Sequence, residues 1–347
     1  MSPDAGGQAA LDYLVDRNPA AGSVVDIAPG VRWLTMPLPG SLNHINLWLL
    51  EDGAGVALID TGIHSDTSKD VWRQVLAGPL AGRKVTRLIV THAHPDHIGL
   101  AGWLCETLGI ELWITETEWR NGRHFSRDTG PLLVESGLAL FQRGGLGTEA
   151  ERRASSRILT RIPMSPVPDA YHRLEDEMAV AIGGHTWRVV IGRGHAPEHA
   201  CLWQKELDLF IAGDQVLPKI TPNVSLWPGR DDADPLGSFI ASTHKIAAIV
   251  PDSVLVLPSH NLPFHRLHTR LDQLRRHHDD RMAEVIAACD DAKSAADLVP
   301  VLFHRKLDER QMAFAMGEAL AHLQYGVTLG HLSRTERADG TWLFSRV

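Results

Sequence analysis

The sequence predicts an α/β fold, and three observations support this prediction. From residue 31 onward, apolar segments rich in β-forming residues alternate with segments of helical spacing, which is the element order of α/β proteins. The chain has 347 residues, enough for one large domain or two unequal ones at roughly 150 residues per domain. Hydrophobic residues make up 44% and charged residues 22%, which argues against a disordered, collagen-like or coiled-coil chain.

The expected strands and helices follow one another in a regular order. Apolar runs bounded by Gly, Pro and Asp predict strands within 31–39, 45–52, 55–62, 87–94, 111–115, 178–184, 186–192, 199–214 and 253–260. Helical spacing predicts helices at 65–76, 98–109 and 267–291, and a short one near 11–15. Ser65 or Asp66 is the expected N-cap of the first of these, and Gly109 the end of the second.

Two segments depart from this alternation of strands and helices. Residues 116–173 are polar, Arg-rich and partly helical, which favours an inserted helical cap over ordinary peripheral helices. Near the C-terminus, helical segments are followed by two β-runs around Asp339–Gly340, the element order of a winged helix. We therefore expect an N-terminal extension at 1–30, a main domain at 31–275 and a small winged-helix-like domain at 276–347.

The net charge of −8 argues against a protein that binds nucleic acid through its overall charge. The tail from Asp280 to Val347 carries eight Lys or Arg against ten Asp or Glu, so we expect it to serve packing or homodimer formation. No apolar run approaches 18 residues, and the N-terminus lacks a signal-peptide pattern, so we expect a cytoplasmic protein without a membrane partner. Three widely spaced cysteines predict neither a disulfide framework nor a Cys-rich zinc site.

Histidine is the compositional outlier, with 19 residues in the chain. The segment THAHPDHIGL places four side chains of ligand type within six residues, at a strand-to-helix junction. Imidazole and carboxylate groups are suitable ligands for divalent zinc, iron or manganese. A loop bent around a metal can direct His92 and His94 to one ion, and Asp96 and His97 to a second.

Three further ligands are expected where predicted strands end, because a sheet holds such positions rigidly. They are His195, Asp214 and His260. His195 completes the first set, His260 completes the second, and Asp214 is left to bridge them. Two divalent ions, Zn²⁺ first and Fe or Mn as alternatives, lower the pKa of a shared water toward neutrality and so produce a hydroxide nucleophile. Asp96 and Asp214 are accordingly the expected catalytic carboxylates.

With these residues in view, the sequence resembles the metallo-β-lactamase superfamily. THAHPDHIGL matches the H-x-H-x-D-H signature. LIDTG stands before it, and GHAPEH, GDQ and a late histidine stand after it, which is the order of these motifs in the family. The resemblance covers roughly 31–268. The resemblance implies an αββα sandwich with a metal site at one edge. Asp214 in its GD motif resembles the glyoxalase II, lactonase and phosphodiesterase types more than true metallo-β-lactamases. The tail resembles the winged-helix appendage of lactamase-like endoribonucleases.

The resemblance also implies roles for residues that are not metal ligands. Asp60 is expected to orient a ligand histidine or its loop, and His199 to support the loop without binding metal. His44 and Asn46 lie near a strand whose start approaches the metal edge in related proteins, so they are candidate substrate contacts or hairpin-turn residues. The other candidate contacts, which follow the Asp214 strand or lie in the predicted cap, are Asn223, Ser225, Trp227, Trp119, Arg120, His124 and Tyr171.

We expect a binuclear metal-dependent hydrolase in which a metal-bridging hydroxide attacks a thioester, ester or lactone carbonyl of a small-molecule substrate. A metal-dependent phosphodiesterase or endoribonuclease acting on RNA or nucleotides is the alternative, supported by the tail and opposed by the negative charge. A di-iron redox protein is a further alternative, but no segment resembles the flavin domain that would supply its electrons. An inactive binding scaffold is the last, although all seven predicted ligands are present.

Overall fold

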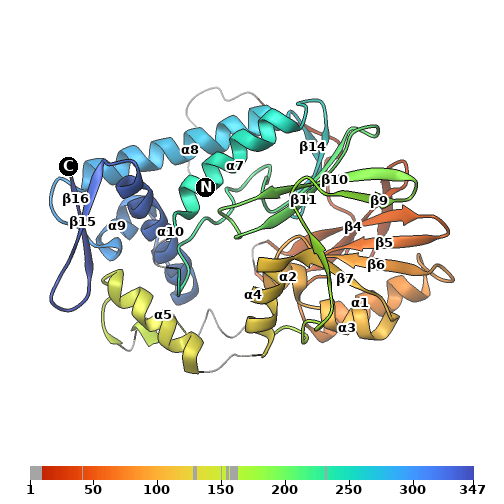
Figure 1. The fold of residues 1–347 in the computed structure, drawn as a ribbon, viewed down its shortest axis with the longest axis horizontal. Coiled ribbons are helices and arrows are strands. Elements are labelled where there is room, and N and C mark those ends of the chain that lie inside the picture. The colour runs from red at the N-terminus through yellow and green to blue at the C-terminus, as the bar shows by residue number, and fades with distance from the viewer. Residues whose placement is uncertain are drawn as a thin grey trace.

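The structure is a computed structural model of the chain, and it describes residues 10–40, 42–127, 131–149, 151–153, 156, 163–230 and 233–347. Two seven-stranded sheets lie face to face, and helices cover the outer face of each (Figure 1). The αββα sandwich expected from the sequence is therefore confirmed.

The first sheet has the strand order β2-β3-β4-β5-β6-β7-β8. Its strands are β2 (Val24–Ala28), β3 (Val31–Pro37), β4 (His44–Asp52), β5 (Gly55–Ile59), β6 (Val85–Ile89), β7 (Leu112–Thr115) and β8 (His172–Leu174). Strands β2 to β5 are antiparallel neighbours, whereas β5 to β8 run parallel. Parallel strands need crossover connections, so the carboxyl ends of β5, β6 and β7 meet at one edge.

The second sheet has the order β1-β14-β13-β12-β11-β10-β9. Its strands are β1 (Asp12–Tyr13), β9 (Ala179–Ile182), β10 (His185–Gly192), β11 (His199–Gln204), β12 (Leu209–Gly213), β13 (Leu255–Pro258) and β14 (Phe264–His265). Among these neighbours, β12 and β13 are the parallel pair. Asp214 and His260 follow these two strands, so both come to the same edge of the sheet.

The core follows from the two-residue period of the strands. In β4, Leu47 and Leu49 pack in the cluster beneath the helices of the first sheet, while Trp48 and Leu50 pack between the sheets. The prediction that most tryptophans are core residues agrees with the burial of Trp33, Trp48, Trp72 and Trp187.

Helices α1 (Asp66–Ala77), α2 (Pro95–Ile98) and α3 (Ala101–Leu108) follow strands of the first sheet, and α7 (Pro235–Ile249) and α8 (Leu267–Ala288) follow strands of the second. The predicted N-cap of α1 is confirmed, because the Ser65 hydroxyl accepts a hydrogen bond from the Ser68 backbone N–H at 3.1 Å. The predicted end of α3 is confirmed as well, with Gly109 in the left-handed conformation at φ 62°.

The predicted insertion at 116–173 connects β7 to β8 and contains α4 (Glu116–Arg127) and α5 (Pro131–Arg143). Residues 128–130, 150, 154–155 and 157–162 lie outside the described residues. Leu140 and Phe141 of α5 pack in one cluster with residues between 295 and 344, in the C-terminal segment. The Gln142 amide also donates to the Asp339 carbonyl oxygen at 2.8 Å. Helix α5 is thus docked on the C-terminal segment, and the role of the insertion as a cap stays a prediction.

The C-terminal segment contains α9 (Ala295–Leu302), α10 (Glu309–Thr328), β15 (Leu332–Glu336) and β16 (Trp342–Arg346). Both helices begin with a capping box, formed by Ser294 with Asp297 and by Asp308 with Gln311. The order of two helices and a hairpin is the predicted one, while the winged-helix assignment and the proposed domain boundaries stay predictions.

The N-terminal segment differs from its prediction. No helix forms at 11–15; instead β1 pairs with β14, and β2 pairs with β3. Five residues gain too few hydrogen bonds to form an isolated helix, whereas a sheet edge offers backbone partners. Residues 10–30 therefore add an edge strand to each sheet. Within the described residues, no helix has the length and apolar character needed to cross a membrane.

Candidate metal centre

The segment from Thr91 to His97 forms the floor of the candidate site, where β6 turns into α2. The Asp60 carboxylate, just after β5, accepts hydrogen bonds from the Thr91 backbone N–H at 2.8 Å and from His97 Nδ1 at 2.8 Å. Asp60 itself has φ 64°, a left-handed conformation that is uncommon outside glycine and concentrated at functional sites. Asp60 thus hydrogen-bonds both the loop and His97, and its role in orienting a metal ligand stays a prediction.

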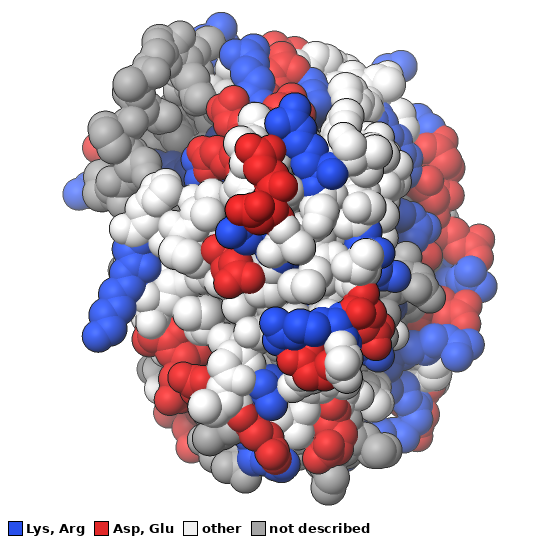
Figure 2. Space-filling view, turned by 90° about the vertical axis from the view of Figure 1, so that its left-hand side faces the viewer, with Lys and Arg blue, Asp and Glu red and all other residues white. Residues whose placement is uncertain are grey.

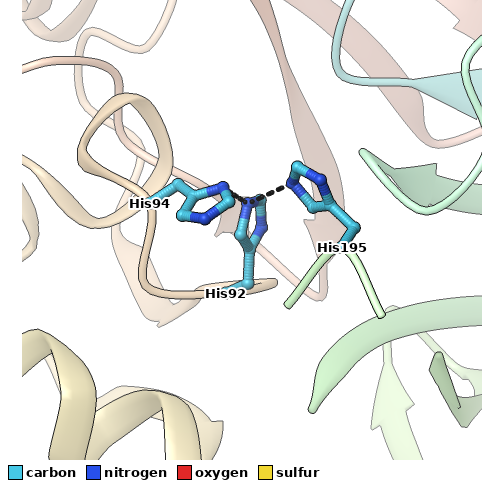
Figure 3. Close-up of side chains that lie close together, drawn as sticks. All are labelled: His92, His94 and His195. Atoms are coloured by element: carbon cyan, nitrogen blue, oxygen red, sulfur yellow. Dashed lines mark hydrogen bonds between the residues drawn. The ribbon is translucent and has the colours of Figure 1, made fainter. Parts of the chain in front are cut away.

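His92, His94 and His195 form the first ligand set (Figure 3). The Nε2 atom of His92 lies 2.9 Å from Nδ1 of His94 and 3.2 Å from Nε2 of His195. Metal–nitrogen bonds of 2.0–2.1 Å in tetrahedral geometry place ligand nitrogens roughly 3.3 Å apart. The spacing of these three nitrogens therefore fits one small divalent ion.

Asp96, His97 and His260 form the second set. His260 Nε2 lies 3.4 Å from Asp96 Oδ2, and His97 Nε2 lies 3.8 Å from the same oxygen. The two predicted groups of three are thus each brought together, and His92 and His97, one from each set, also lie close to one another and to Asp214.

Asp214 lies between the two sets. Its Oδ2 is 3.5 Å from His195 Nε2 in the first set and 3.5 Å from His97 Nε2 in the second, while Oδ1 is 3.5 Å from His260 Nε2. His97 Nε2 and Asp214 Oδ1 are buried without a hydrogen-bond partner in the described part of the chain. Buried polar atoms are normally paired, so these two atoms fit a group that binds them both.

Three of the histidines are held in the tautomer that a metal ligand needs. The Nδ1–H of His195 donates to the Asn223 carbonyl at 2.8 Å, and that of His260 donates to the His44 carbonyl at 3.0 Å. His97 donates in the same way to Asp60. Each Nε2 therefore faces the centre of the site and can offer its lone pair to a metal ion once it carries no proton.

The two sets differ in electrostatics. Burial, followed by the His195 imidazole, lowers the pKa of His94 to about 3, and burial also lowers the pKa of His92 well below its usual range. Burial acts in the same direction on His260, but the Asp214 and Asp96 carboxylates together outweigh it and raise the pKa of His260 to about 10. His92 and His94 are thus neutral imidazoles, whereas His260 of the second set is paired with carboxylates.

His199 contacts the backbone next to the candidate ligand Asp214, and its predicted role as a supporting residue that binds no metal stays a prediction. Its Nε2 accepts a hydrogen bond from the Asp214 backbone N–H at 3.0 Å. A Cβ on Gly213 would lie 2.4 Å from that same nitrogen, so glycine is required for this close approach. His199 therefore fixes the backbone that carries Asp214.

The two predicted substrate contacts on β4, His44 and Asn46, have different surroundings. His44 contributes its carbonyl to His260, and its ring lies against Asn43 and Asn18. Asn46 is only 1% exposed, accepts from the Trp33 indole and donates to the carbonyls of Pro258 and Asn261. Asn46 is thus a structural residue that ties β4 to the His260 loop, not a substrate-facing one.

The other candidate contacts divide into two groups. Near the site, the Asn223 amide oxygen accepts from the Ser225 hydroxyl at 2.8 Å, and the Trp227 ring centroid lies 6.3 Å from that of His94. In the insertion, Trp119 and Tyr171 stack on one another with centroids 4.4 Å apart. Arg120 pairs with Glu116, and His124 contacts Phe125.

Glu118, in the first turn of α4, was missed by the sequence reasoning. It is 1% exposed, and its carboxylate accepts from the backbone N–H of Ala93 at 2.9 Å and of Glu198 at 2.9 Å. These two amides belong to the loops that carry His92, His94 and His195. The available signal was its position just after the strand β7, at the sheet edge where the other site residues gather.

Comparisons with known proteins agree with this geometry. The family model described as Metallo-beta-lactamase superfamily matches residues 40–273, and the model described as Metallo-beta-lactamase-like, C-terminal domain matches residues 282–347. The crystal structure of a Beta-lactamase domain protein from Burkholderia ambifaria is 43% identical, covers 97% of this chain and 98% of its own, and superposes with a TM-score of 0.87.

More distant relatives give the same result. A metallo-beta-lactamase family protein from Thermus thermophilus is 30% identical, with 92% and 99% coverage and a TM-score of 0.76. The Beta-lactamase-like protein 2 homolog of Caenorhabditis elegans is 22% identical over 72% of this chain and 67% of its own length. A probable metallo-hydrolase of Bacillus subtilis is 23% identical over 66% of this chain and 90% of its own length.

The superfamily model spans well over half of the chain, and the two matches together extend to the C-terminus. The chain therefore belongs to the metallo-beta-lactamase superfamily and is a metal-dependent hydrolase.

Proposed function

We propose that this hydrolase uses two divalent metal ions, Zn²⁺ first, to cleave a thioester, ester or lactone. The observation that carries the proposal is the position of Asp214, whose carboxylate lies 3.5 Å from nitrogens of both ligand sets. His92, His94 and His195 would hold one ion, Asp96, His97 and His260 the other, and Asp214 both. When bound, such a pair activates water as a nucleophile and polarises the scissile carbonyl.

The chain's own residues serve to position this centre. Asp60 and the His44 carbonyl fix the rings of His97 and His260. Water adds to the acyl carbon, the bond to sulfur or oxygen breaks, and a carboxylate leaves with a thiol or alcohol and one proton. Cys105 and Cys201 are disfavoured as nucleophiles, because burial raises the pKa of their thiols.

The phosphodiester alternative requires a positively charged surface for a nucleic acid. Figure 2 views the molecule from the left-hand side of Figure 1, the end that carries β15 and β16, and there Lys and Arg side chains alternate with Asp and Glu. Among the described residues of this face, the C-terminal segment offers no continuous basic patch, which favours the carbonyl substrate over a nucleic acid.

The test combines metal analysis with a substrate panel on one preparation. The panel contains a glutathione thioester, an acyl-homoserine lactone, a phosphodiester and a β-lactam. About two equivalents of metal with turnover of a thioester or lactone supports the proposal. Two equivalents with turnover of the phosphodiester alone would replace it by the nuclease alternative. One equivalent or none, without turnover after metal is added, would show that the ligand assignment is wrong.

A further inference from the structure

The candidate ligands differ in their access to solvent. His94 and Asp96 are partly exposed, and the Asp96 side chain keeps 23% of its surface. The other five are buried, at 6% exposure or less, namely His92, His97, His195, Asp214 and His260. Among the seven candidate ligands, His94 and Asp96 therefore mark the more accessible side of the centre.

Two aromatic side chains stand on this side. The Trp227 ring lies edge-on to His94, with centroids 6.3 Å apart at 65°, and Phe314 of α10 lies 5.9 Å from Trp227 at 90°. Both are half-buried, and neither packs in any of the four hydrophobic clusters formed by the described residues. Large aromatic rings usually contribute to a core, so a pair left outside it beside a ligand suggests a binding surface.

The pair is held in place by α10. The Leu226 backbone N–H, next to Trp227, donates to the Gly317 carbonyl at 2.9 Å. A Cβ on Gly317 would lie 2.9 Å from the Ser225 Cβ, so glycine allows the loop to lie directly on the helix. The same loop supplies the Asn223 carbonyl that orients His195. The aromatic rings and the first ligand set are therefore connected through one short loop.

We propose that Trp227 and Phe314 form an aromatic subsite that takes the apolar acyl or aryl group of the substrate. The proposal rests on the proposed function, in which the scissile carbonyl is held at the metal centre. Each methylene buried against such rings strengthens binding roughly fourfold, whereas a carboxylate or phosphate would be desolvated there without a partner. The C-terminal segment, through Phe314, thus selects substrates with an apolar acyl part.

Phe314→Ala tests the subsite, because the ring of Phe314 lies against Trp227 and Phe314 is not itself a candidate metal ligand. Turnover is measured on acetyl, hexanoyl and benzoyl thioesters of one thiol, with metal content measured on each preparation. In the wild type, kcat/KM should be at least about tenfold higher for hexanoyl and benzoyl than for acetyl. In the variant this preference should fall at least about fivefold, mainly through a higher KM for the hexanoyl and benzoyl substrates, with the metal content unchanged. Phe125→Ala, which removes an exposed Phe from α4, should keep the wild-type preference.

Binding of the matching hydroxamic acids, which are not turned over, separates this inference from the proposed function. Tighter binding of hexanohydroxamate than of acetohydroxamate, lost in Phe314→Ala, supports the subsite even if no thioester is cleaved. Thioester turnover with the same chain-length preference in wild type and Phe314→Ala would overturn the subsite and leave the proposed function standing. Equal wild-type affinity for the two hydroxamates would overturn it as well.

Discussion

Removing the Glu118 carboxylate should loosen the metal centre from outside its ligand set. The carboxylate joins the loop of His92 and His94 to the loop of His195 through two backbone amides, each at 2.9 Å. Burial raises the pKa of Glu118, while the two amide donors oppose that rise. The side chain thus has a desolvation cost that its hydrogen bonds offset.

The magnitude follows from the two amides that Glu118→Ala leaves behind. The Ala93 N–H is buried, so its loss of a partner costs about 1–3 kcal/mol. The Glu198 N–H is partly exposed, and water can replace the carboxylate there at a smaller cost. We expect the free energy of unfolding to fall by about 2–4 kcal/mol in total. Metal affinity should fall about 10–100-fold, as for other groups that orient metal ligands.

Urea unfolding of the metal-free protein and a zinc titration measure the two effects separately. Glu118→Gln keeps one acceptor and should lose about half as much stability as Glu118→Ala. Glu116→Ala is the matched control, because Glu116 lies on the same helix and pairs with Arg120 at the surface. Solvent screens such an exposed pair, so its loss should change stability little. If Glu118→Ala unfolds and binds zinc like Glu116→Ala, the carboxylate does not hold the loops together.

Four further predictions follow from other parts of the structure. His94→Ala or Asp96→Ala should abolish turnover, because each removes a candidate metal ligand. Circular dichroism should still show a folded protein, because both side chains are partly exposed. Full activity of either variant would contradict the site. A chelator should lower Tm, since an ion at 100 times its Kd stabilises the folded state by about 2.7 kcal/mol; an unchanged Tm would argue against bound metal. Gly317→Ala should weaken zinc binding in a titration, because its Cβ would lie 2.9 Å from Ser225, on the loop that orients a ligand. Burial lowers the pKa of His278 from 6.5 to about 2, so below pH 6.5 the unfolded chain binds a proton that the folded protein does not. The stability contributed by His278 is therefore present above pH 6.5 and is lost as the pH falls, with the free energy of unfolding lower by about 1.4 kcal/mol at pH 5.5. His278→Asn should therefore lose less stability than the wild type between pH 7.5 and 5.5 in urea unfolding.

The sequence was most informative where chemistry and local order coincide. The candidate ligands between His92 and His97 lie in one turn, so their proximity is a property of a few consecutive residues. Asp214 and His260 are distant in sequence, but each follows a strand, and β12 and β13 are parallel neighbours. Their meeting at one edge is therefore a consequence of element order, which periodicity and the resemblance to the superfamily both indicate.

The sequence was least informative where a role depends on which way a side chain points or on a distant partner. Asn46 was expected near the substrate, but the pleat of β4 directs it to Trp33 and to the loop after His260. Glu118 acts through two amides that are 25 and 80 residues away from it in the chain. Phe314 lies within an ordinary helical pattern, and its distinction is only that it packs outside the core. No local pattern encodes these contacts.

The two sides of the centre depend on different parts of the chain. His97 and His260 are oriented by Asp60 and by the start of β4, both in the first sheet. His195 is oriented by the Asn223 carbonyl, on the loop that rests on α10 at Gly317. The C-terminal segment therefore contacts the more accessible side of the centre, whereas residues of the sandwich support the second set. Such a division allows the aromatic subsite to change with α10 while the sandwich continues to hold the metal-binding framework.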